Sequence, residues 1–191
     1  HEQPVSHFTS DGIVVGDTEI KLDAVIFATG FDVMTGAMDR IDIRGREDQT
    51  LKARWAESVT SHLGMMTHGF PNLFWINGPH SPFYNPILLA EFQCDFVTEL
   101  IDGMTDHGAE VIEAKADEEH RYVQLTNDIG NSTLYPESDN YYMGDNIPGK
   151  PRATLFWFGG FPFYRKQCRL AREEWKGLEV GSDHAQHHQA N

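Results

Sequence analysis

Residues 70–90, FPNLFWINGPHSPFYNPILLA, join a short apolar run to a loop rich in proline and glycine and then to a long helix. The apolar run Leu73–Ile76 predicts a buried strand. Asn85 is a favoured N-cap and Pro86 suits the first helical position after it. A loop between a strand and a helix N-terminus is a common ligand position in α/β proteins, because the positive end of the helix dipole faces it. From the pattern alone, an ordinary strand–helix connection remains the alternative.

The composition predicts one folded domain with an acidic surface. The chain has 191 residues, 40% of them hydrophobic, and a net charge of −14. This length suits one medium domain. The charge argues against nucleic acid and anionic membranes as partners, and no apolar run approaches the roughly 18 residues of a membrane span. The chain starts at His1 without a signal pattern, so we expect a cytoplasmic protein whose sequence begins inside a longer one.

The N-terminal region predicts a hairpin followed by a core strand. Ile13–Val15 is interpreted as extended, Gly16 and Asp17 supply a turn, and Glu19–Leu22 alternates in polarity, which together predict a β-hairpin. The apolar run Ala24–Ala28 ends at Thr29 and Gly30 and predicts an interior parallel strand. Few residues precede this run, so they can hardly supply the neighbours that a buried strand needs.

The rest of the chain predicts an alternation of short strands and helices. The helix that begins at Pro86 has apolar residues at helical intervals as far as about Asp102, and Gly103 predicts its end. Further strands are predicted at 41–43, 111–114 and 154–158, and further helices at 51–58, 117–131 and 164–177.

No single residue pattern defines a catalytic or metal site. Cys94 and Cys168 lie in predicted helices and are interpreted as small core residues rather than a disulfide. The histidines show no spacing typical of a metal site. His80 is expected to be a surface loop histidine rather than a general base.

A long loop at 135–152 is a second candidate for function, because long ordered loops in compact domains are often functional. Its stretch Gly144–Lys150 is similar to phosphate-binding sequences but lacks the spacing of a P-loop. Tyr141 and Tyr142 are either core aromatics, which is the first expectation, or a lid that stacks on a planar ligand.

Several motifs that are individually weak occur in a fixed order. They are DAVIFATGFD (23–32), LKARW (51–55), LG (63–64), FPNLF (70–74), GPHSPFYNPILLAE (78–91) and YMGDNIPGK (142–150). Together they resemble the C-terminal part of flavin-dependent Baeyer–Villiger monooxygenases of the cyclohexanone and cyclopentadecanone type. The resemblance runs from about Gly12 to Val180.

The resemblance implies an α/β fold that is the C-terminal part of a flavoprotein with two Rossmann-like dinucleotide-binding domains, incomplete on its own. Residues 1–30 would be the end of the NADP-binding domain and a linker. Residues 31–180 would be the C-terminal half of the FAD-binding domain, and 181–191 a disordered tail. The family uses NADPH to reduce FAD, and inserts one oxygen atom of O₂ next to a ketone carbonyl to give an ester or lactone.

The resemblance also implies the flavin and substrate contacts. Phe83, Tyr84 and Asn85 would line the substrate pocket beside the flavin. The helix start, formed by Asn85, Pro86 and Ile87, would aim its N–H groups at the pyrimidine edge of the flavin, where negative charge develops on reduction. Pro86 is unusual for the family, but its missing N–H costs nothing in a first helical turn.

Two further regions are assigned by the same resemblance. Ala28, Thr29 and Gly30 would form the passage from the NADP domain to the FAD domain. Tyr141 would be the tip of a mobile loop that folds over NADP, with Lys150 near its base. The family usually has Trp at the position of Tyr141, so an aromatic ring is kept while the indole N–H is replaced by a phenol.

The largest departure from the family is that several of its characteristic motifs are missing from this chain. The chain has no G-x-G-x-x-G, so neither phosphate-binding fingerprint is present, and the family's long signature and the arginine beside its flavin are missing as well. We therefore expect no monooxygenase activity without an N-terminal partner, the missing part of the same enzyme. The alternatives are a non-catalytic complementing fragment, a plain ligand-binding α/β module, and a flavin hydroxylase that attacks nitrogen or sulfur. No metal is expected.

Overall fold

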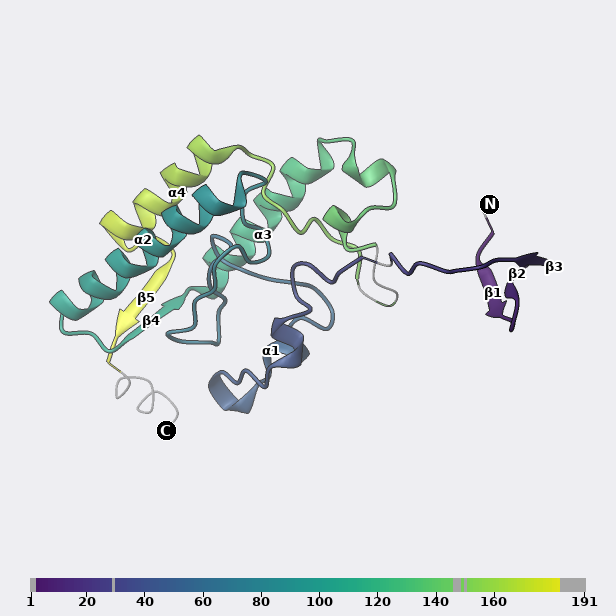
Figure 1. Ribbon diagram of the computed structural model, residues 1–191. Helices are drawn as coiled ribbons and strands as arrows, with labels where there is room; N and C mark the ends of the chain where they lie inside the picture. The colour runs from purple at the N-terminus through teal and green to yellow at the C-terminus, as the bar shows by residue number, and fades with distance from the viewer. Residues whose placement is uncertain (1–2, 29, 146–148, 150, 183–191) are drawn as a thin grey trace. The chain divides into compact units, whose positions relative to one another are not determined.

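The computed structural model describes residues 3–28, 30–145, 149 and 151–182. The chain divides into two units, His1–Phe31 and Asp32–Asn191, and each is described by itself (Figure 1).

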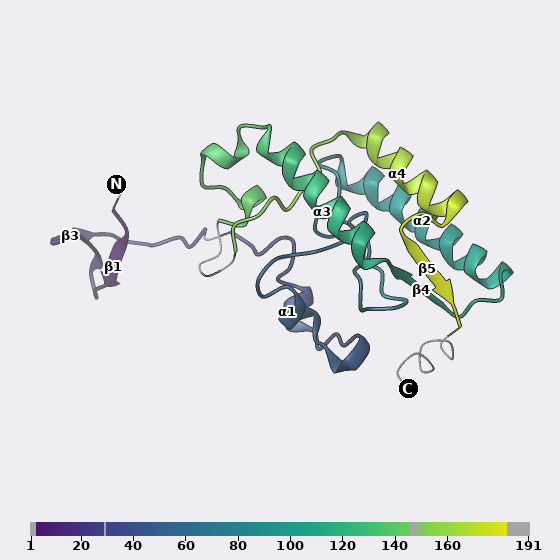
Figure 2. The same ribbon diagram turned by 180° about the vertical axis from the view of Figure 1, so that it is seen from behind.

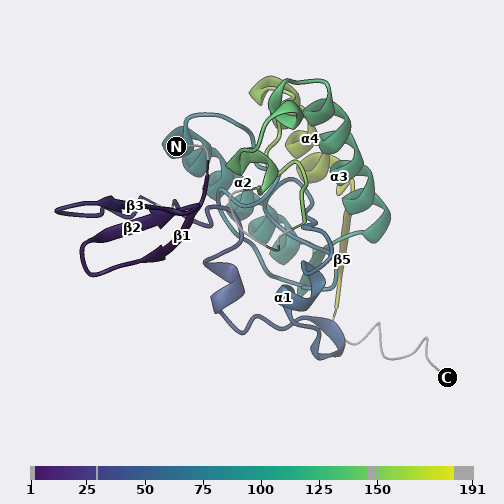
Figure 3. The ribbon, with the colours of Figure 1, turned by 90° about the vertical axis from the view of Figure 1, so that its right-hand side faces the viewer.

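The first unit is a three-stranded antiparallel sheet in the order β1–β2–β3, seen side by side in Figure 3. Its strands are β1 (Val5–Phe8), β2 (Gly12–Val15) and β3 (Thr18–Lys21). The predicted hairpin is confirmed, and Gly16 supplies the positive φ of +61° at its turn. β1 was not predicted, because its sequence VSHF shows no clear alternation.

The predicted interior strand at Ala24–Ala28 is wrong for this chain. These residues form no strand, and the side chains of Val25, Ile26 and Phe27 are 42%, 89% and 70% exposed. The apolar run has the composition of a buried strand, but a strand forms only where neighbours can take up its backbone N–H and C=O groups. The described residues supply no such neighbours.

The second unit packs helices around a short antiparallel pair of strands. The elements are α2 (Pro86–Asp106), β4 (Val111–Ala114), α3 (Ala116–Asn131), α4 (Phe161–Glu174) and β5 (Leu178–Gly181). Figures 1 and 2 show α2 beside α4 and β4 beside β5. No helix among the described residues combines the length and apolarity that crossing a membrane requires.

The core of the second unit consists of apolar side chains from these helices, from β4 and β5 and from two loops. Its members include Leu63, Met65, Met66, Leu89, Phe96, Leu100, Ile112, Tyr122, Trp157, Tyr164 and Cys168.

A smaller buried cluster surrounds Trp55, which is in the core as predicted. The shorter helical segments are α1 (Leu51–Arg54), η1 (Met38–Arg40), η2 (Arg46–Asp48), η3 (Tyr135–Glu137) and η4 (Tyr141–Met143).

The long helix begins at Pro86 as predicted but ends later. α2 continues through Gly103 to Asp106, and Gly108, at φ +65°, follows its end. A Cβ on Gly103 would lie 3.2 Å from the Trp175 ring, so this glycine allows close packing rather than ending the helix. The remaining helices lie close to their predictions, although the predicted helix at 51–58 is reduced to the single turn of α1.

One of the two cysteines was placed wrongly. Cys168 is buried in the core as expected, but Cys94 is exposed. On α2, the buried positions are Leu89, Gln93, Phe96 and Leu100. Cys94 follows Gln93 by one residue and therefore lies on the outward side of the helix.

Several predicted strands are replaced by irregular segments. The runs 41–43, 73–76 and 154–158 form no regular strand, and only an isolated parallel bridge joins Pro82 to Trp157. β4 is confirmed, whereas its partner β5 was missed. Gly181 was expected to open a disordered tail, but it is the last residue of β5 and pairs with Val111. The tail from residue 183 onwards lies outside the described residues.

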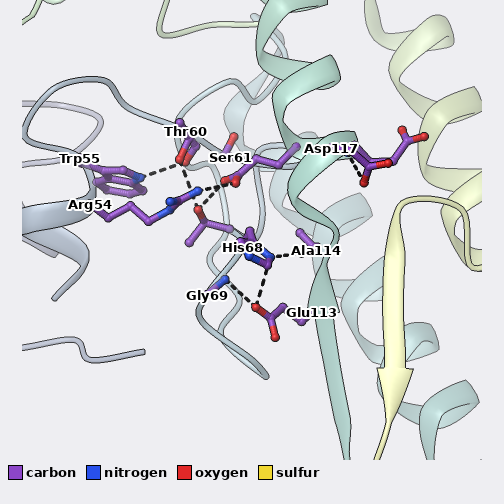
Figure 4. A network of polar contacts seen from close by, with 12 residues as sticks. Arg54, Trp55, Thr60, Ser61, His68, Gly69, Glu113, Ala114 and Asp117 are labelled. Atoms are coloured by element: carbon purple, nitrogen blue, oxygen red, sulfur yellow. Dashed lines mark hydrogen bonds and ion pairs between the residues drawn. The ribbon is translucent and has the colours of Figure 1, made fainter. Parts of the chain in front are cut away.

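Two buried carboxylates, Glu113 and Glu119, attach the loops before α2 to β4 and α3. Figure 4 shows Glu113 with its contacts to Gly69 and His68. The Arg46 guanidinium lies 2.8 Å from Glu113, and the Arg54 guanidinium lies 2.7 Å from Glu119. The two carboxylate side chains are only 1% and 3% exposed. Thr67 Oγ1 also donates to Glu119. Each charge is therefore paired, as buried charges must be.

Candidate functional site

The loop that leads into α2 is held by a buried amide. The side chain of Gln93, which is fully buried, accepts from Asn77 N at 2.7 Å and donates to Ser81 Oγ at 3.1 Å. It also donates to Tyr164 OH at 2.8 Å. Sequence reasoning missed Gln93, although a glutamine between Leu89 and Phe96 on the apolar face of α2 was the available signal. These bonds fix both the start and the middle of the loop.

His80 belongs to this buried framework and is not on the surface, so that expectation was wrong. It is 1% exposed, and its Nδ1 lies 2.9 Å from Ser61 Oγ. Burial lowers the pKa of His80 to about 4, so the ring is neutral at pH 7. Its carbonyl accepts from Tyr122 OH at 3.0 Å. With the serine and the histidine both buried, the pair holds the loop in place.

The start of α2 has its first donors already occupied. Asn85 Oδ1 accepts from Ile87 N at 3.0 Å and from Leu88 N at 3.2 Å, while Pro86 has no N–H. Leu89 N donates to Asn85 O, so the expectation that free N–H groups at this helix start face a ligand is wrong. A ligand here would meet the positive end of the helix dipole and the exposed side chains of Ile87 and Leu88, which are 72% and 50% exposed.

Replacing Asn85 by alanine is expected to lower the free energy of unfolding by about 1 kcal/mol, because two N–H groups of α2 lose their side-chain acceptor. Urea unfolding followed by tryptophan fluorescence measures the loss. Asn85→Asp is the matched control, since it keeps an acceptor oxygen at the helix start. Equal stability of the Ala and Asp variants would show that the cap contributes nothing.

Phe83 and Tyr84 leave this loop in different directions. Phe83 joins a group of rings that we call the aromatic cluster, whereas Tyr84 stacks on Phe161 of α4 with centroids 4.4 Å apart. The aromatic cluster consists of Phe83, Tyr135, Tyr141, Tyr142, Phe156 and Phe158.

The aromatic cluster joins the loop that carries Phe83 to the long loop that begins at Tyr135. Phe83 meets Tyr142 edge-on at 5.4 Å, and Tyr142 lies 4.0 Å from Tyr141. Phe83 and Tyr141 are 53% and 41% exposed, so both present ring surface to a ligand. Tyr141 is exposed and Tyr142 is half-buried, so the first expectation, that both are core aromatics, is wrong.

Of the remaining candidate residues Ala28, Thr29, Gly30 and Lys150, the structure describes only Ala28 and Gly30. Ala28 is exposed, and Gly30 has φ +78° with open space around it; both belong to the first unit. Thr29 and Lys150 lie outside the described residues.

One described feature suits an anionic group of a cofactor, the positive end of the α2 dipole. The sequence has no phosphate-binding fingerprint. Among the described residues, no group of three or more His, Cys, Asp or Glu side chains could hold a metal ion.

Comparison with known proteins identifies the chain as related to monooxygenases. It is 35% identical over 184 residues to the phenazine N-monooxygenase PhzNO1 of Lysobacter antibioticus, covering 95% of this chain and 34% of the relative. It is 37% identical over 185 residues to the cyclopentanone 1,2-monooxygenase of a Comamonas species, with the same coverage of both chains. The chain thus spans about a third of the length of these relatives. No family model matches it.

The fold agrees with this relationship. The structure of OTEMO in complex with FAD and NADP superposes with a TM-score of 0.85 at 34% identity, covering 94% of this chain and 34% of that chain. Over nearly its whole length, the chain is therefore similar to about a third of Baeyer–Villiger monooxygenases of the cyclohexanone and cyclopentanone monooxygenase type.

Proposed function

We propose that this chain is the C-terminal third of an FAD- and NADPH-dependent monooxygenase that inserts oxygen next to a ketone carbonyl. The observation that carries the proposal is the aromatic cluster, where the expected substrate loop at Phe83 packs against the expected cofactor loop at Tyr141. The family relationship, which extends over almost the whole chain, supports the same assignment.

In this proposal, residues 1–30 end an NADP-binding domain and lead through Ala28, Thr29 and Gly30 into the FAD-binding part at 31–180. Lys150 belongs to the base of the cofactor loop.

In this proposal, the residues at the start of α2 would act on the charge of the flavin. A bound flavin would supply the electrons that activate O₂. The positive end of α2 would stabilise negative charge on the flavin edge beside Asn85, Pro86 and Ile87. The exposed side chains of Ile87 and Leu88 would exclude water from that edge. Phe83 and Tyr84 would shape the space for the ketone.

Oxygenation of nitrogen is the second candidate function, because one relative of similar identity is a phenazine N-monooxygenase. A chimera tests both candidates: this chain replaces the segment that it matches in the Comamonas cyclopentanone monooxygenase. We expect the chimera to retain yellow flavin and to convert cyclopentanone to its lactone. Conversion of phenazine to an N-oxide without lactone would favour the second candidate. A flavin-loaded chimera that oxygenates neither compound would contradict the proposal.

Phe83→Ala and Tyr84→Ala in this chimera should change the relative kcat/KM for small and large cyclic ketones several-fold. Both side chains are about half exposed on the substrate loop, at 53% and 44%, so their removal enlarges the pocket without unfolding it. Flavin content, read from the visible absorbance, should stay constant. Unchanged relative kcat/KM values for small and large ketones would contradict the prediction that Phe83 and Tyr84 line the substrate pocket.

Tyr141→Ala in the chimera should raise the KM for NADPH and uncouple its oxidation from product formation. The ring is 41% exposed at the expected tip of the cofactor loop, where it can stack on a planar ligand. Tyr141→Trp restores an aromatic surface and is the matched control. Unchanged KM and coupling in the Ala variant would exclude the loop from NADPH binding.

A further inference from the structure

We propose that Tyr142 is a positioning residue for Phe83. As a result, the substrate loop (residues 82–85) and the described part of the cofactor loop (residues 135–145) change conformation together. The functional names of these two loops rest on the proposed function, but the coupling itself rests only on their contacts.

The first argument is the set of ring contacts made by Tyr142. Its ring meets Phe83 at 5.4 Å with an interplanar angle of 87°, Tyr135 at 4.7 Å and Phe158 at 6.2 Å. Phe83 also lies 6.0 Å from Phe158. The edge-on arrangement is a preferred geometry for aromatic pairs, and such a pair shifts an equilibrium roughly 2- to 12-fold. Movement of the Tyr142 ring therefore removes a contact that orients Phe83.

The second argument is the backbone that both loops share. Both loops form backbone hydrogen bonds with the segment 153–158. Phe83 N donates to Trp157 O at 3.0 Å, and Leu155 N donates to Tyr142 O at 2.9 Å. One short segment thus bonds to the substrate loop on one side and to the cofactor loop on the other.

This shared segment is fixed, so the rings are the part that can move. Trp157 is fully buried, stacks on Tyr122 at 5.3 Å, and its Nε1 donates to Gly160 O at 3.1 Å. In contrast, the Phe83 ring is 53% exposed. A change in one loop therefore reaches the other through the Phe83–Tyr142 ring pair, and the backbone of the segment stays in place.

The neighbouring residue supplies a matched control. Tyr84 stacks on Phe161 and makes no ring contact with the aromatic cluster among the described residues. Phe83 and Tyr84 are adjacent and similarly exposed, so only the Phe83 substitution removes a contact with Tyr142.

Amide hydrogen exchange on this chain tests the coupling without any cofactor. The amides of Met143, Gly144 and Asp145 are hydrogen-bonded within the cofactor loop and report its opening. Phe83→Leu should raise their exchange rates roughly 2- to 10-fold, whereas Tyr84→Leu should leave them unchanged.

The reciprocal experiment follows the Phe83 amide. Tyr142→Ala should accelerate its exchange by a similar factor, and Tyr142→Phe, which keeps the ring, should restore the original rate. The amides of α3 serve as the internal reference for global opening. Equal rates in the Phe83 and Tyr84 variants, or failure of Tyr142→Phe to restore the rate, would overturn the coupling. Because no flavin is involved, either result leaves the chimera test of the proposed function independent.

Discussion

Replacing Arg54 by methionine is expected to lower the free energy of unfolding by about 3–5 kcal/mol, because the substitution leaves a buried carboxylate without its cation. The Glu119 side chain is 3% exposed, and the Arg54 guanidinium lies 2.7 Å from it. The remaining partner, Thr67 Oγ1, is neutral and cannot balance the charge. Urea unfolding followed by tryptophan fluorescence measures the loss.

Two further variants separate this effect from a general loss of charge. Arg172→Met removes an ion pair of similar length, 2.6 Å to Glu99, but both side chains are about half exposed, so we expect a cost of about 0–1 kcal/mol. The double variant Arg54→Met with Glu119→Gln removes the unpaired charge and should recover much of the loss. Similar losses for Arg54→Met and Arg172→Met would contradict the role of burial.

Stability is also expected to fall steeply as the pH drops from about 6.5 towards 4. Burial lowers the pKa of His62 and of His80 to about 4, against roughly 6.5 in an unfolded chain. Between these values the unfolded chain binds more protons than the folded one. The stability contribution is therefore complete above about pH 6.5 and is lost as the pH approaches the folded pKa. The loss amounts to about 3 kcal/mol for each histidine.

The pH dependence is measured by urea unfolding at intervals between pH 7.5 and 4.5. The ring nitrogens of His62 have no hydrogen-bond partner of good geometry among the described residues, so His62→Phe replaces the ring without breaking a bond. This variant should lose about half of the pH dependence. His120 is exposed, and His120→Gln should leave the dependence intact. Equal stability at both ends of the range would contradict the neutral, buried state of these rings.

Elements specified by local signals were predictable from the sequence. Asn85 and Pro86 marked the start of α2, and the turn at Gly16 marked the hairpin. The strands expected at 24–28, 73–76 and 154–158 are not regular strands, because apolar composition is local whereas a strand needs a continuous ladder of backbone partners. The described residues offer no such partners at 24–28. Residues 154–158 do bond to Ser81, Phe83 and Tyr142, but these bonds form only an isolated bridge at Trp157.

The candidate site was predictable in its parts and not in its connections. The sequence indicated Phe83 and Tyr141, but the contact between their loops runs through Tyr142 and was not foreseen. The buried bonds of Gln93 and His80 were missed as well. Gln93 and Tyr164 are 71 positions apart, so no local pattern relates them.

The central claim is that this chain supplies one wall of a flavin site and needs the rest of the enzyme to hold the cofactor. The decisive measurement is flavin retention and NADPH oxidation by the purified chain, alone and after co-expression with the part of the Comamonas cyclopentanone monooxygenase that it does not match. We predict no bound flavin and no NADPH oxidation for the chain alone, and a flavin that co-elutes with both polypeptides after co-expression. A yellow, NADPH-oxidising chain on its own would contradict the claim.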